Sequence, residues 1–153
     1  MTHLIIHTPG LLTTLQDQGR YGYQRFGMPV AGAMDEFSMA LCNLLVGNSP
    51  GAACMEATLT GPEIIFSSFG AVAVSGADMG PCINGKPVSL WTTIEVRKDD
   101  RLCFTGLKTG CRTYIAFAGG IHVPRVMNSR STYLRARLGG FEGRALKPGD
   151  KIL

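Results

Sequence analysis

Short apolar or alternating runs, each ended by turn residues, set the strongest limit on how this chain can fold. Gly, Pro, Asn or Asp separates each run from the next. Runs of this length at this spacing are typical of an antiparallel barrel or sandwich, so we predict a mainly β fold. The predicted strands are 4–7, 11–15, 53–59, 63–66, 71–75, 92–96, 101–105 and 112–118.

Two details sharpen the strand prediction. In the run 53–59 every second residue, from Ala53 to Leu59, is apolar, which predicts a strand with one apolar face. The dipeptide Asn84-Gly85 lies between two short apolar runs and predicts a two-residue hairpin. At the C-terminal end, residues 147–153 read as a turn and the start of an apolar strand. We expect either a short strand that closes the domain or a longer protein that has been cut.

One short amphipathic helix is predicted near residues 35–46. Asp35 is a suitable N-cap, and Gly47 is a suitable C-terminal stop. As an alternative to a plain cap, the amides and carboxylate of residues 32–35 could form part of a site at the helix N-terminus. Apolar residues recur at helical spacing and predict a core-facing stripe made of Phe37, Ala40, Leu41, Leu44 and Leu45.

Composition excludes several classes of protein. Of the 153 residues, 45% are hydrophobic and 17% are charged, which argues against intrinsic disorder and allows one domain with a real core. The 20 glycines follow no G-X-Y period, so the chain is not collagen. No apolar stretch is long enough for a membrane span, and the first ten residues lack a signal-peptide pattern. We therefore expect a cytoplasmic protein.

The cysteines and histidines do not form a metal-binding pattern. The five cysteines include no CxxC pair and lie among apolar or small residues, which predicts buried free thiols, with a metal or redox role as the alternative. The three histidines form no HExxH motif, so no metal site is predicted. These residues are Cys42, Cys54, Cys82, Cys103, Cys111, His3, His7 and His122.

Charge is unevenly distributed along the chain. Residues 1–96 carry three basic and seven acidic side chains, whereas residues 97–153 carry twelve basic and four acidic ones. Five arginines in the basic part suit bidentate contacts with oxyanions, and the alternative is a solvated basic face. Nucleic acid is not predicted, because only Tyr133 and Phe141 are available for stacking and no known motif is present. The arginines are Arg125, Arg130, Arg135, Arg137 and Arg144.

Polar residues gather in glycine-rich segments that we predict to be loops, at 16–22, 27–35, 76–78, 119–120 and 129–132. Several such loops at one barrel mouth could form a ligand site. The chain has neither a P-loop nor a G-x-S-x-G elbow, so a self-contained nucleotide cradle or serine hydrolase is not predicted. For each of the charged residues named next, the alternative to a catalytic or binding role is a structural one, in turn capping or a salt bridge. The candidates are Asp17, Asp35, Glu56 and Asp78 for general acid or base chemistry, and Arg20, Arg130 and Arg144 for anion binding.

Eight ordered motifs across nearly the whole chain resemble the biotin-dependent carboxyltransferase or allophanate hydrolase subunit 2 family, which includes the C subunit of 5-oxoprolinase. The motifs are Leu15-Gln16-Asp17-x-Gly19-Arg20-x-Gly22-Tyr23, Gly27-x-Pro29-x-x-Gly32-Ala33-Met34-Asp35, Asn43 with Leu45-Val46-Gly47-Asn48, Glu56 with Gly61-Pro62, Gly76-Ala77-Asp78, Ala118-Gly119-Gly120, Ser129-x-Ser131-Thr132, and Gly139-Gly140-x-x-Gly143-Arg144-x-Leu146-x-x-Gly149-Asp150.

The resemblance implies a cyclophilin-like β-barrel, with residues 1–153 as one β-rich domain and the N-terminal half of a two-barrel protein. It implies ATP-dependent ring opening of 5-oxoproline to glutamate, together with the A and B subunits of 5-oxoprolinase as partners, the latter being a Kip inhibitor-like protein. ATP would bind in the complex, with no metal or biotin on this chain. Gln16, Arg20, Ser131 and Arg144 are the implied residues for substrate or phosphate binding.

Two other functions are compatible with the same resemblance. One is a non-catalytic antagonist that binds a Kip-type inhibitor of a histidine kinase. The other is a carboxyltransferase-like domain of a urea carboxylase or allophanate hydrolase system. We expect the chain to have little activity on its own and to expose an apolar face.

Overall fold

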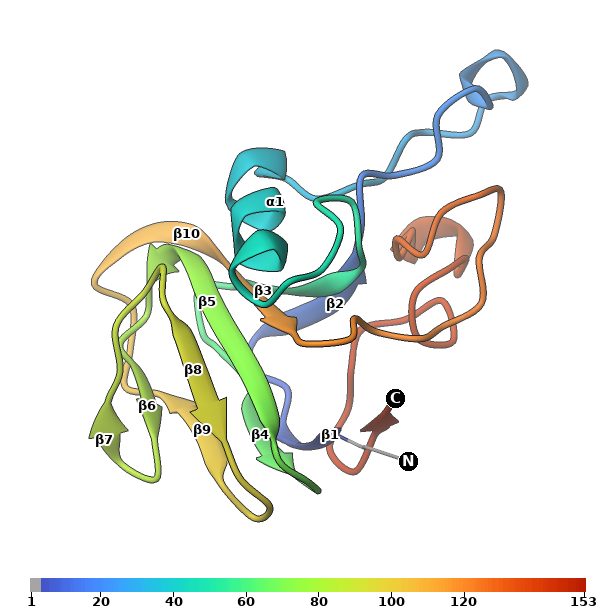
Figure 1. The fold of residues 1–153 in the computed structure, drawn as a ribbon. Coiled ribbons are helices and arrows are strands. Elements are labelled where there is room, and N and C mark those ends of the chain that lie inside the picture. Colours follow the sequence, from blue (N-terminus) through green and yellow to red (C-terminus); the bar gives the residue numbers. More distant parts are fainter. Residues whose placement is uncertain (1–3) are drawn as a thin grey trace.

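The computed structural model describes residues 4–153 and consists mainly of antiparallel strands (Figure 1). The elements in chain order are β1 (Leu4–Thr8), β2 (Leu12–Gln16), the 3₁₀ helix η1 (Gln24–Phe26), α1 (Glu36–Leu45), β3 (Cys54–Thr58), β4 (Glu63–Phe66), β5 (Gly70–Asp78), β6 (Pro81–Ile83), β7 (Lys86–Pro87), β8 (Thr93–Val96), β9 (Arg101–Phe104), β10 (Thr109–Phe117), the 3₁₀ helix η2 (Leu134–Ala136) and β11 (Lys151–Ile152).

The strands form two sheets around one main core. One sheet has the order β11-β1-β4-β9-β6-β7 and the other the order β2-β3-β10-β5-β8. Side chains from both sheets meet in the core, including Ile6 and Ile64 from the first and Met55 and Val72 from the second. The predicted mainly β fold is confirmed, and each predicted strand is present with its ends displaced by a few residues at most.

The 84–85 hairpin is also confirmed. Ile83 pairs with Lys86, so that Asn84 and Gly85 form the two-residue turn between β6 and β7. Both have positive φ, 51° and 78°, as the favoured two-residue hairpin turn requires. At the end of the chain, β11 pairs with β1, so the first and last strands lie side by side (Figure 1).

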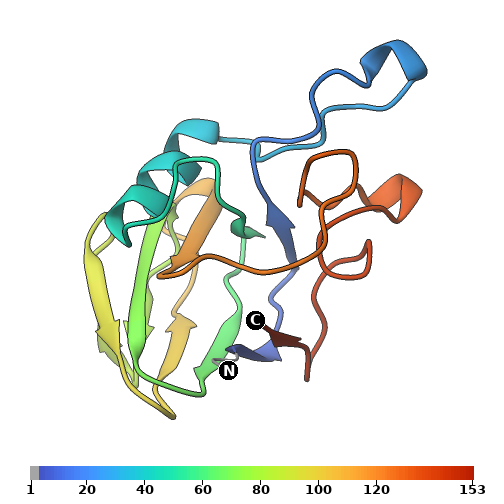
Figure 2. The ribbon, with the colours of Figure 1, turned by 45° about the vertical axis from the view of Figure 1, so that its right-hand side comes forward.

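Strand β3 is buried on both faces, which corrects the prediction of one apolar face. Met55 lies in the main core, whereas Cys54 packs in a second cluster with Met39 and Cys42 of α1. Helix α1 lies across the outer side of the five-stranded sheet in both ribbon views (Figures 1 and 2). The helix therefore covers the face that the sequence pattern assigned to solvent.

Helix α1 has the predicted position, but the predicted core stripe is only partly correct, because Leu45 packs against the second cluster while Ala40 and Leu41 are only half-buried. Asp35 is the N-cap, and Gly47 follows the last turn with a φ of 77°. Phe37 is 72% exposed and Leu44 is 53% exposed, whereas the buried residues are Ser38, Met39, Cys42 and Asn43. The helix packs through a face rotated away from its most apolar side.

This orientation is possible because the buried polar groups of α1 find partners. Ser75 Oγ donates to the Ser38 carbonyl at 2.8 Å, and Asn43 Nδ2 donates to the Ala52 carbonyl at 2.8 Å. Burying such groups without partners would be unfavourable. With these partners in place, Phe37 and Leu44 lie in solvent.

We predict that Phe37→Ser changes the free energy of unfolding by less than about 0.5 kcal/mol, because an exposed side chain far from buried contacts contributes little. Met39→Ala, two residues further along the helix and fully buried, should lower it by about 2–3 kcal/mol. Urea denaturation followed by circular dichroism measures both. A larger loss for Phe37→Ser than for Met39→Ala would contradict this orientation of the helix.

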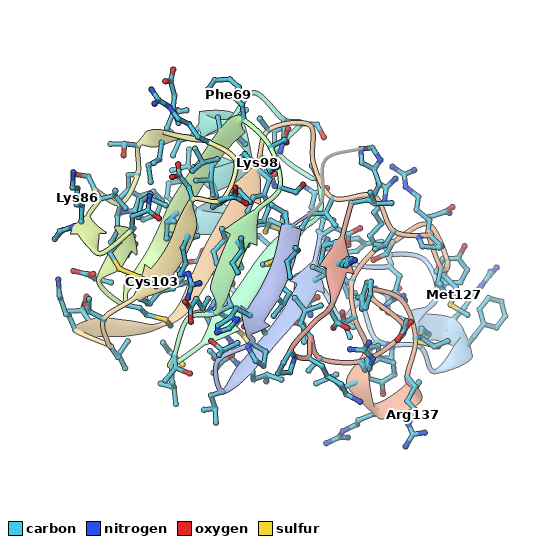
Figure 3. All side chains as sticks on the ribbon, turned by 90° about the horizontal axis from the view of Figure 1, so that it is seen from below. Phe69, Lys86, Lys98, Cys103, Met127 and Arg137 are labelled. Carbon is cyan, nitrogen blue, oxygen red and sulfur yellow. A yellow bond between two sulfur atoms is a disulfide. The ribbon has the colours of Figure 1, made fainter. Side chains whose placement is uncertain are left out.

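The cysteine prediction holds for only two of the five residues. Cys42 and Cys54 are buried free thiols, and burial raises the pKa of the Cys42 thiol to about 11. Cys82 and Cys103 instead form a disulfide between the paired strands β6 and β9, where Figure 3 labels Cys103. Cys111 is free and exposed. The pairing depends on two strands that are neighbours in the sheet but separated in sequence.

An arm formed by residues 18–32 extends from the body of the molecule and carries η1 at its tip (Figures 1 and 2). At its base Arg20 N–H donates to Val30 O at 2.8 Å and Ala33 N–H donates to Asp17 O at 2.9 Å. A Cβ on Gly32 would lie 2.5 Å from the Gln18 carbonyl oxygen. Glycine is thus required where the two sides of the arm meet.

No helix within residues 4–153 combines the length and the hydropathy needed to cross a membrane. A cytoplasmic location stays a prediction.

Candidate functional site

The carboxylate of Asp17 is the centre of a buried polar cluster that joins the end of β2 to the loop 129–131. Its Oδ1 accepts hydrogen bonds from Ser131 Oγ at 2.6 Å, Ser129 Oγ at 2.7 Å and Gly19 N at 2.8 Å. Its Oδ2 accepts one from Arg130 N at 2.6 Å. We call these residues the Asp17 cluster. Because four protein donors hold the carboxylate, its geometry is that of an anchor for two loops.

Arg20 lies beside this cluster and is completely buried. Its Nη2 donates to the Ser131 carbonyl at 2.5 Å and its Nε donates to the Val126 carbonyl at 3.4 Å. Its Nη1 has no hydrogen-bond partner, and among the described residues no carboxylate forms an ion pair with it. Burial lowers the pKa of Arg20, and the negative charge of Asp17 opposes this effect.

Gln16 is the remaining predicted site residue that lies beside the Asp17 cluster. Its Nε2 donates to Thr14 Oγ1 at 2.9 Å and to the Thr132 carbonyl at 3.3 Å. Its Oε1 is buried and has no partner. Unpartnered buried polar atoms are uncommon in folded proteins and call for an explanation such as a ligand or an ordered water.

A cavity of about 380 Å³ lies next to Arg20, and we call it the glycine-walled cavity. Its lining consists of residues 122–124 and 139–143, with Val126, Lys151 and Leu153. Arg20 contacts this wall from behind, because Nε bonds to Val126 and a Cβ on Gly139 would lie 2.5 Å from Nη2. The volume falls within the range of roughly 300–1,000 Å³ that small-molecule sites occupy.

Glu56 and Asp35 meet in a second polar network at the N-terminus of α1. Glu56 Oε2 accepts hydrogen bonds from Met34 N and from Tyr114 Oη, both at 2.8 Å. Tyr114 Oη in turn accepts one from Asp35 N at 2.8 Å. Burial and the Glu56 charge raise the pKa of Tyr114. Arg112 Nε lies 3.5 Å from Glu56 Oε1, so this network contains its own counter-charge.

Asp35 acts as a helix cap. Its Oδ1 accepts from Ser38 N at 3.0 Å and its Oδ2 from Ser38 Oγ at 2.5 Å. These bonds hold the pKa of Asp35 below its ordinary value. A cavity of about 380 Å³ adjoins Asp35, Trp91 and Arg112, but its charged groups are already engaged in the cap and in the Glu56 network.

Asp78 lies apart from both networks. It ends strand β5, so the segment 76–78 belongs to a strand and not to the predicted loop. Its Oδ1 accepts from Gly80 N at 2.8 Å, and its Oδ2 lies 3.7 Å from Lys108 Nζ. The contacts are those of the turn-capping and salt-bridging alternative.

Arg144 also lies outside the Asp17 cluster. It forms a bidentate ion pair with Asp150, at 2.8 and 3.0 Å, and donates twice to Glu142 Oε2, at 3.0 and 2.7 Å. These bonds clamp the turn that leads into β11. Arg125, Arg135 and Arg137 are exposed, whereas Arg130 Nε donates to the Val123 carbonyl at 2.9 Å. The arginine-rich segment therefore divides between structural contacts and a solvated face.

The Arg144 clamp predicts a pH-dependent stability. Burial alone would raise the pKa of Asp150, but hydrogen bonds from Arg144 and from Lys147 N outweigh burial and lower it. A carboxyl whose pKa is lower in the folded state stabilises the fold fully above about pH 4 and loses this effect as the pH falls through the folded-state pKa. We expect Asp150→Asn to flatten the loss of Tm below about pH 4, measured by thermal melting. A Tm curve parallel to that of the exposed-site control Glu95→Gln would contradict this.

The predicted site residues thus fall into four places. Gln16, Asp17, Arg20 and Ser131 lie together, Asp35 and Glu56 form the second network, and Asp78 and Arg144 each lie apart. Their catalytic and binding roles stay predictions. Sequence reasoning missed Tyr114, which sits in an apolar strand, and Lys151 beside the cavity.

No group of three His, Cys, Asp or Glu side chains in the described range could hold a metal ion. His3 lies outside the described residues.

The fold and the site define a mainly β module that occurs within larger enzymes. The solved structure of Kluyveromyces lactis urea amidolyase matches with a TM-score of 0.96 and 38% identity, over 99% of this chain and 9% of that one. A family model described as the carboxyltransferase domain, subdomain A and B, matches residues 26–153. The chain belongs to this carboxyltransferase domain family, which confirms the family resemblance.

Curated relatives fall into two groups. The chain is 43% identical over 148 residues to a urea amidolyase of Lachancea kluyveri, covering 96% of this chain and 8% of that protein. It is 38% identical over 143 residues to the 5-oxoprolinase C subunit of Escherichia coli, covering 94% of this chain and 46% of that protein. The chain therefore spans less than half the length of these relatives.

Proposed function

We propose that this chain is part of the C subunit of an ATP-dependent 5-oxoprolinase, which opens 5-oxoproline to glutamate together with A and B subunits. The observation that carries the proposal is the likeness to two 5-oxoprolinase C subunits, at 38% and 37% identity over 94% and 91% of this chain. The engaged carboxylates of Asp17, Asp35 and Glu56 support a chain that needs partners for catalysis.

The chemistry explains why ATP and several subunits are needed. The lactam of 5-oxoproline is a resonance-stabilised amide, and phosphorylation of its carbonyl oxygen makes the carbon a better electrophile for water. Cationic side chains offset the developing negative charge. Near the glycine-walled cavity this chain offers the ammonium of Lys151 and the buried charge of Arg20, a donor set that suits one carboxylate better than a triphosphate. We therefore assign ATP to a partner protein.

The test is glutamate release from 5-oxoproline by the full-length protein mixed with the A and B subunits. We expect release that requires ATP and all three components. Omission of each component in turn is the control. Turnover at background in the complete mixture would reject the 5-oxoprolinase function.

A urea carboxylase function is the second candidate, favoured by the 43% identity to the urea amidolyase of Lachancea kluyveri. It predicts consumption of urea that depends on ATP, bicarbonate and a biotinylated carrier protein. The same preparation assayed with urea and with 5-oxoproline separates the two activities. A preparation that binds a Kip-type inhibitor but lacks both activities would instead favour the non-catalytic antagonist.

A further inference from the structure

We propose that the glycine-walled cavity binds the carboxylate group of a small cyclic amide, held by the Lys151 ammonium on the solvent side and by the positive charge of Arg20 behind the wall. This inference rests on the proposed function and deepens it, because it assigns the substrate to one cavity of this chain. It also predicts that the chain recognises the substrate by its carboxylate group.

The first argument is the unused donor of Arg20. The side chain is completely buried and Nη1 lacks an acceptor, and although the charge of Asp17 acts on the guanidinium, the two groups form no ion pair. Burying a cationic donor without an acceptor is unfavourable unless a ligand or water provides one. An anion in the neighbouring cavity would provide it, because Val126 and Gly139 both contact Arg20 and line the cavity.

The second argument is the charge balance of the lining. Lys151 is exposed at the cavity and forms no ion pair with any residue in 4–153. Glu142 is the acidic lining residue, and its Oε2 already accepts two hydrogen bonds from Arg144. The lining therefore has the free ammonium of Lys151 against one carboxylate that is already paired, which favours an anionic ligand.

The third argument is the apolar character of the remaining wall. Val123, Val126, Phe141 and Leu153 line the cavity beside the cationic groups. Apolar lining with a few placed polar groups is typical of small-molecule sites. A ligand that joins a carboxylate to a small ring with apolar methylene groups fits both the cationic and the apolar parts of the cavity. 5-Oxoproline has this chemistry, whereas urea has neither the charge nor the ring.

The test is calorimetric titration of the full-length protein with 5-oxoproline, with 2-pyrrolidinone and with urea. The lactam 2-pyrrolidinone has the same ring without the carboxylate. We expect 5-oxoproline to bind about 10- to 100-fold more tightly than 2-pyrrolidinone, as a charge-assisted hydrogen bond implies. Equal affinity for the two lactams, or tighter binding of urea, would overturn the inference.

Variants locate the binding site. Lys151→Met should weaken 5-oxoproline binding about 10-fold or more and leave the weak binding of 2-pyrrolidinone unchanged. The control is Lys98→Met, which should bind both lactams as the wild type does. Lys98 lies at the turn between β8 and β9, and Figure 3 shows it far from Met127 and Arg137, which are near the cavity segments in sequence. Arg20→Lys keeps the charge but shortens its reach, so it should also weaken 5-oxoproline binding. Unchanged 5-oxoproline affinity in Lys151→Met would overturn the inference even if Arg20→Lys fails to fold.

The binding and turnover assays separate the inference from the proposed function. If the complete assembly releases glutamate and Lys151→Met leaves the KM for 5-oxoproline unchanged, the function stands and this site assignment is wrong. If the assembly is inactive but the wild-type protein binds 5-oxoproline in the predicted order, the site stands and the 5-oxoprolinase function is wrong.

Discussion

Asp17→Ala is expected to lower the free energy of unfolding by about 4–5 kcal/mol, the largest effect that we predict for a single substitution in this chain. The substitution removes the acceptor for Gly19 N, Arg130 N and the hydroxyls of Ser129 and Ser131. Each buried donor left without an acceptor is destabilising by about 1–3 kcal/mol, although the hydroxyls can turn toward other acceptors. Effects of this size arise when a buried polar network is broken.

Chemical denaturation of Asp17→Ala and of the exposed-site control Glu95→Ala measures the difference. Glu95→Ala should stay within about 0.5 kcal/mol of the wild type, because exposed substitutions have small effects. Asp17→Asn keeps the size and one acceptor oxygen, so its stability should lie between the two. A loss below about 1 kcal/mol for Asp17→Ala would show that the Asp17 cluster does not hold the loops together.

Gly139→Ala is expected to destabilise the fold by about 4 kcal/mol. Gly139 has a φ of 66°, where a side chain is unfavourable by roughly 1–2 kcal/mol. A Cβ there would also overlap the Ser131 carbonyl oxygen and lie 2.5 Å from Arg20 Nη2. Because backbone and a buried guanidinium cannot easily move, the overlap adds to the conformational effect.

Gly119→Ala is the matched control for Gly139→Ala. Gly119 also has a positive φ, of 90°, but a Cβ there would meet nothing within 4 Å. It should therefore lose only about 1 kcal/mol, from the backbone conformation alone. Thermal or urea unfolding compares the two variants. Equal losses of unfolding free energy in the two variants would mean that close packing of the 139–143 segment on the Asp17 cluster does not contribute to stability.

Much of the local structure could be predicted because its causes are local. The alternation of apolar residues and the turn residues between them located the strands, and Asp35 and Gly47 located the ends of α1. The Asn84-Gly85 turn formed as predicted, since two residues that tolerate positive φ suffice for it. The motif residues Gln16, Asp17, Arg20 and Ser131 proved to be neighbours, although their order along the chain said nothing of the contacts between them.

What could not be predicted depends on which elements become neighbours. The buried face of α1 was missed because Ser38 and Asn43 are satisfied by residues outside the helix, Ser75 and Ala52. The Cys82–Cys103 disulfide was missed because it requires β6 to pair with β9. The pairing of Arg144 with Asp150 and Glu142 was not predicted either, because it depends on how the turn before β11 folds, and the binding role of Arg144 stays a prediction.

The sequence by itself determined the mainly β fold, the position of the helix, the family and the motif residues, but not that four of these residues gather around Asp17. Only the tertiary structure decided how each polar group is paired, and hence that Asp17 anchors two loops while Arg20 Nη1 lacks an acceptor and Lys151 lacks an ion pair beside a cavity. The physical reason is that backbone preferences act over a few residues, whereas pairing and burial of charges depend on distant segments meeting in space.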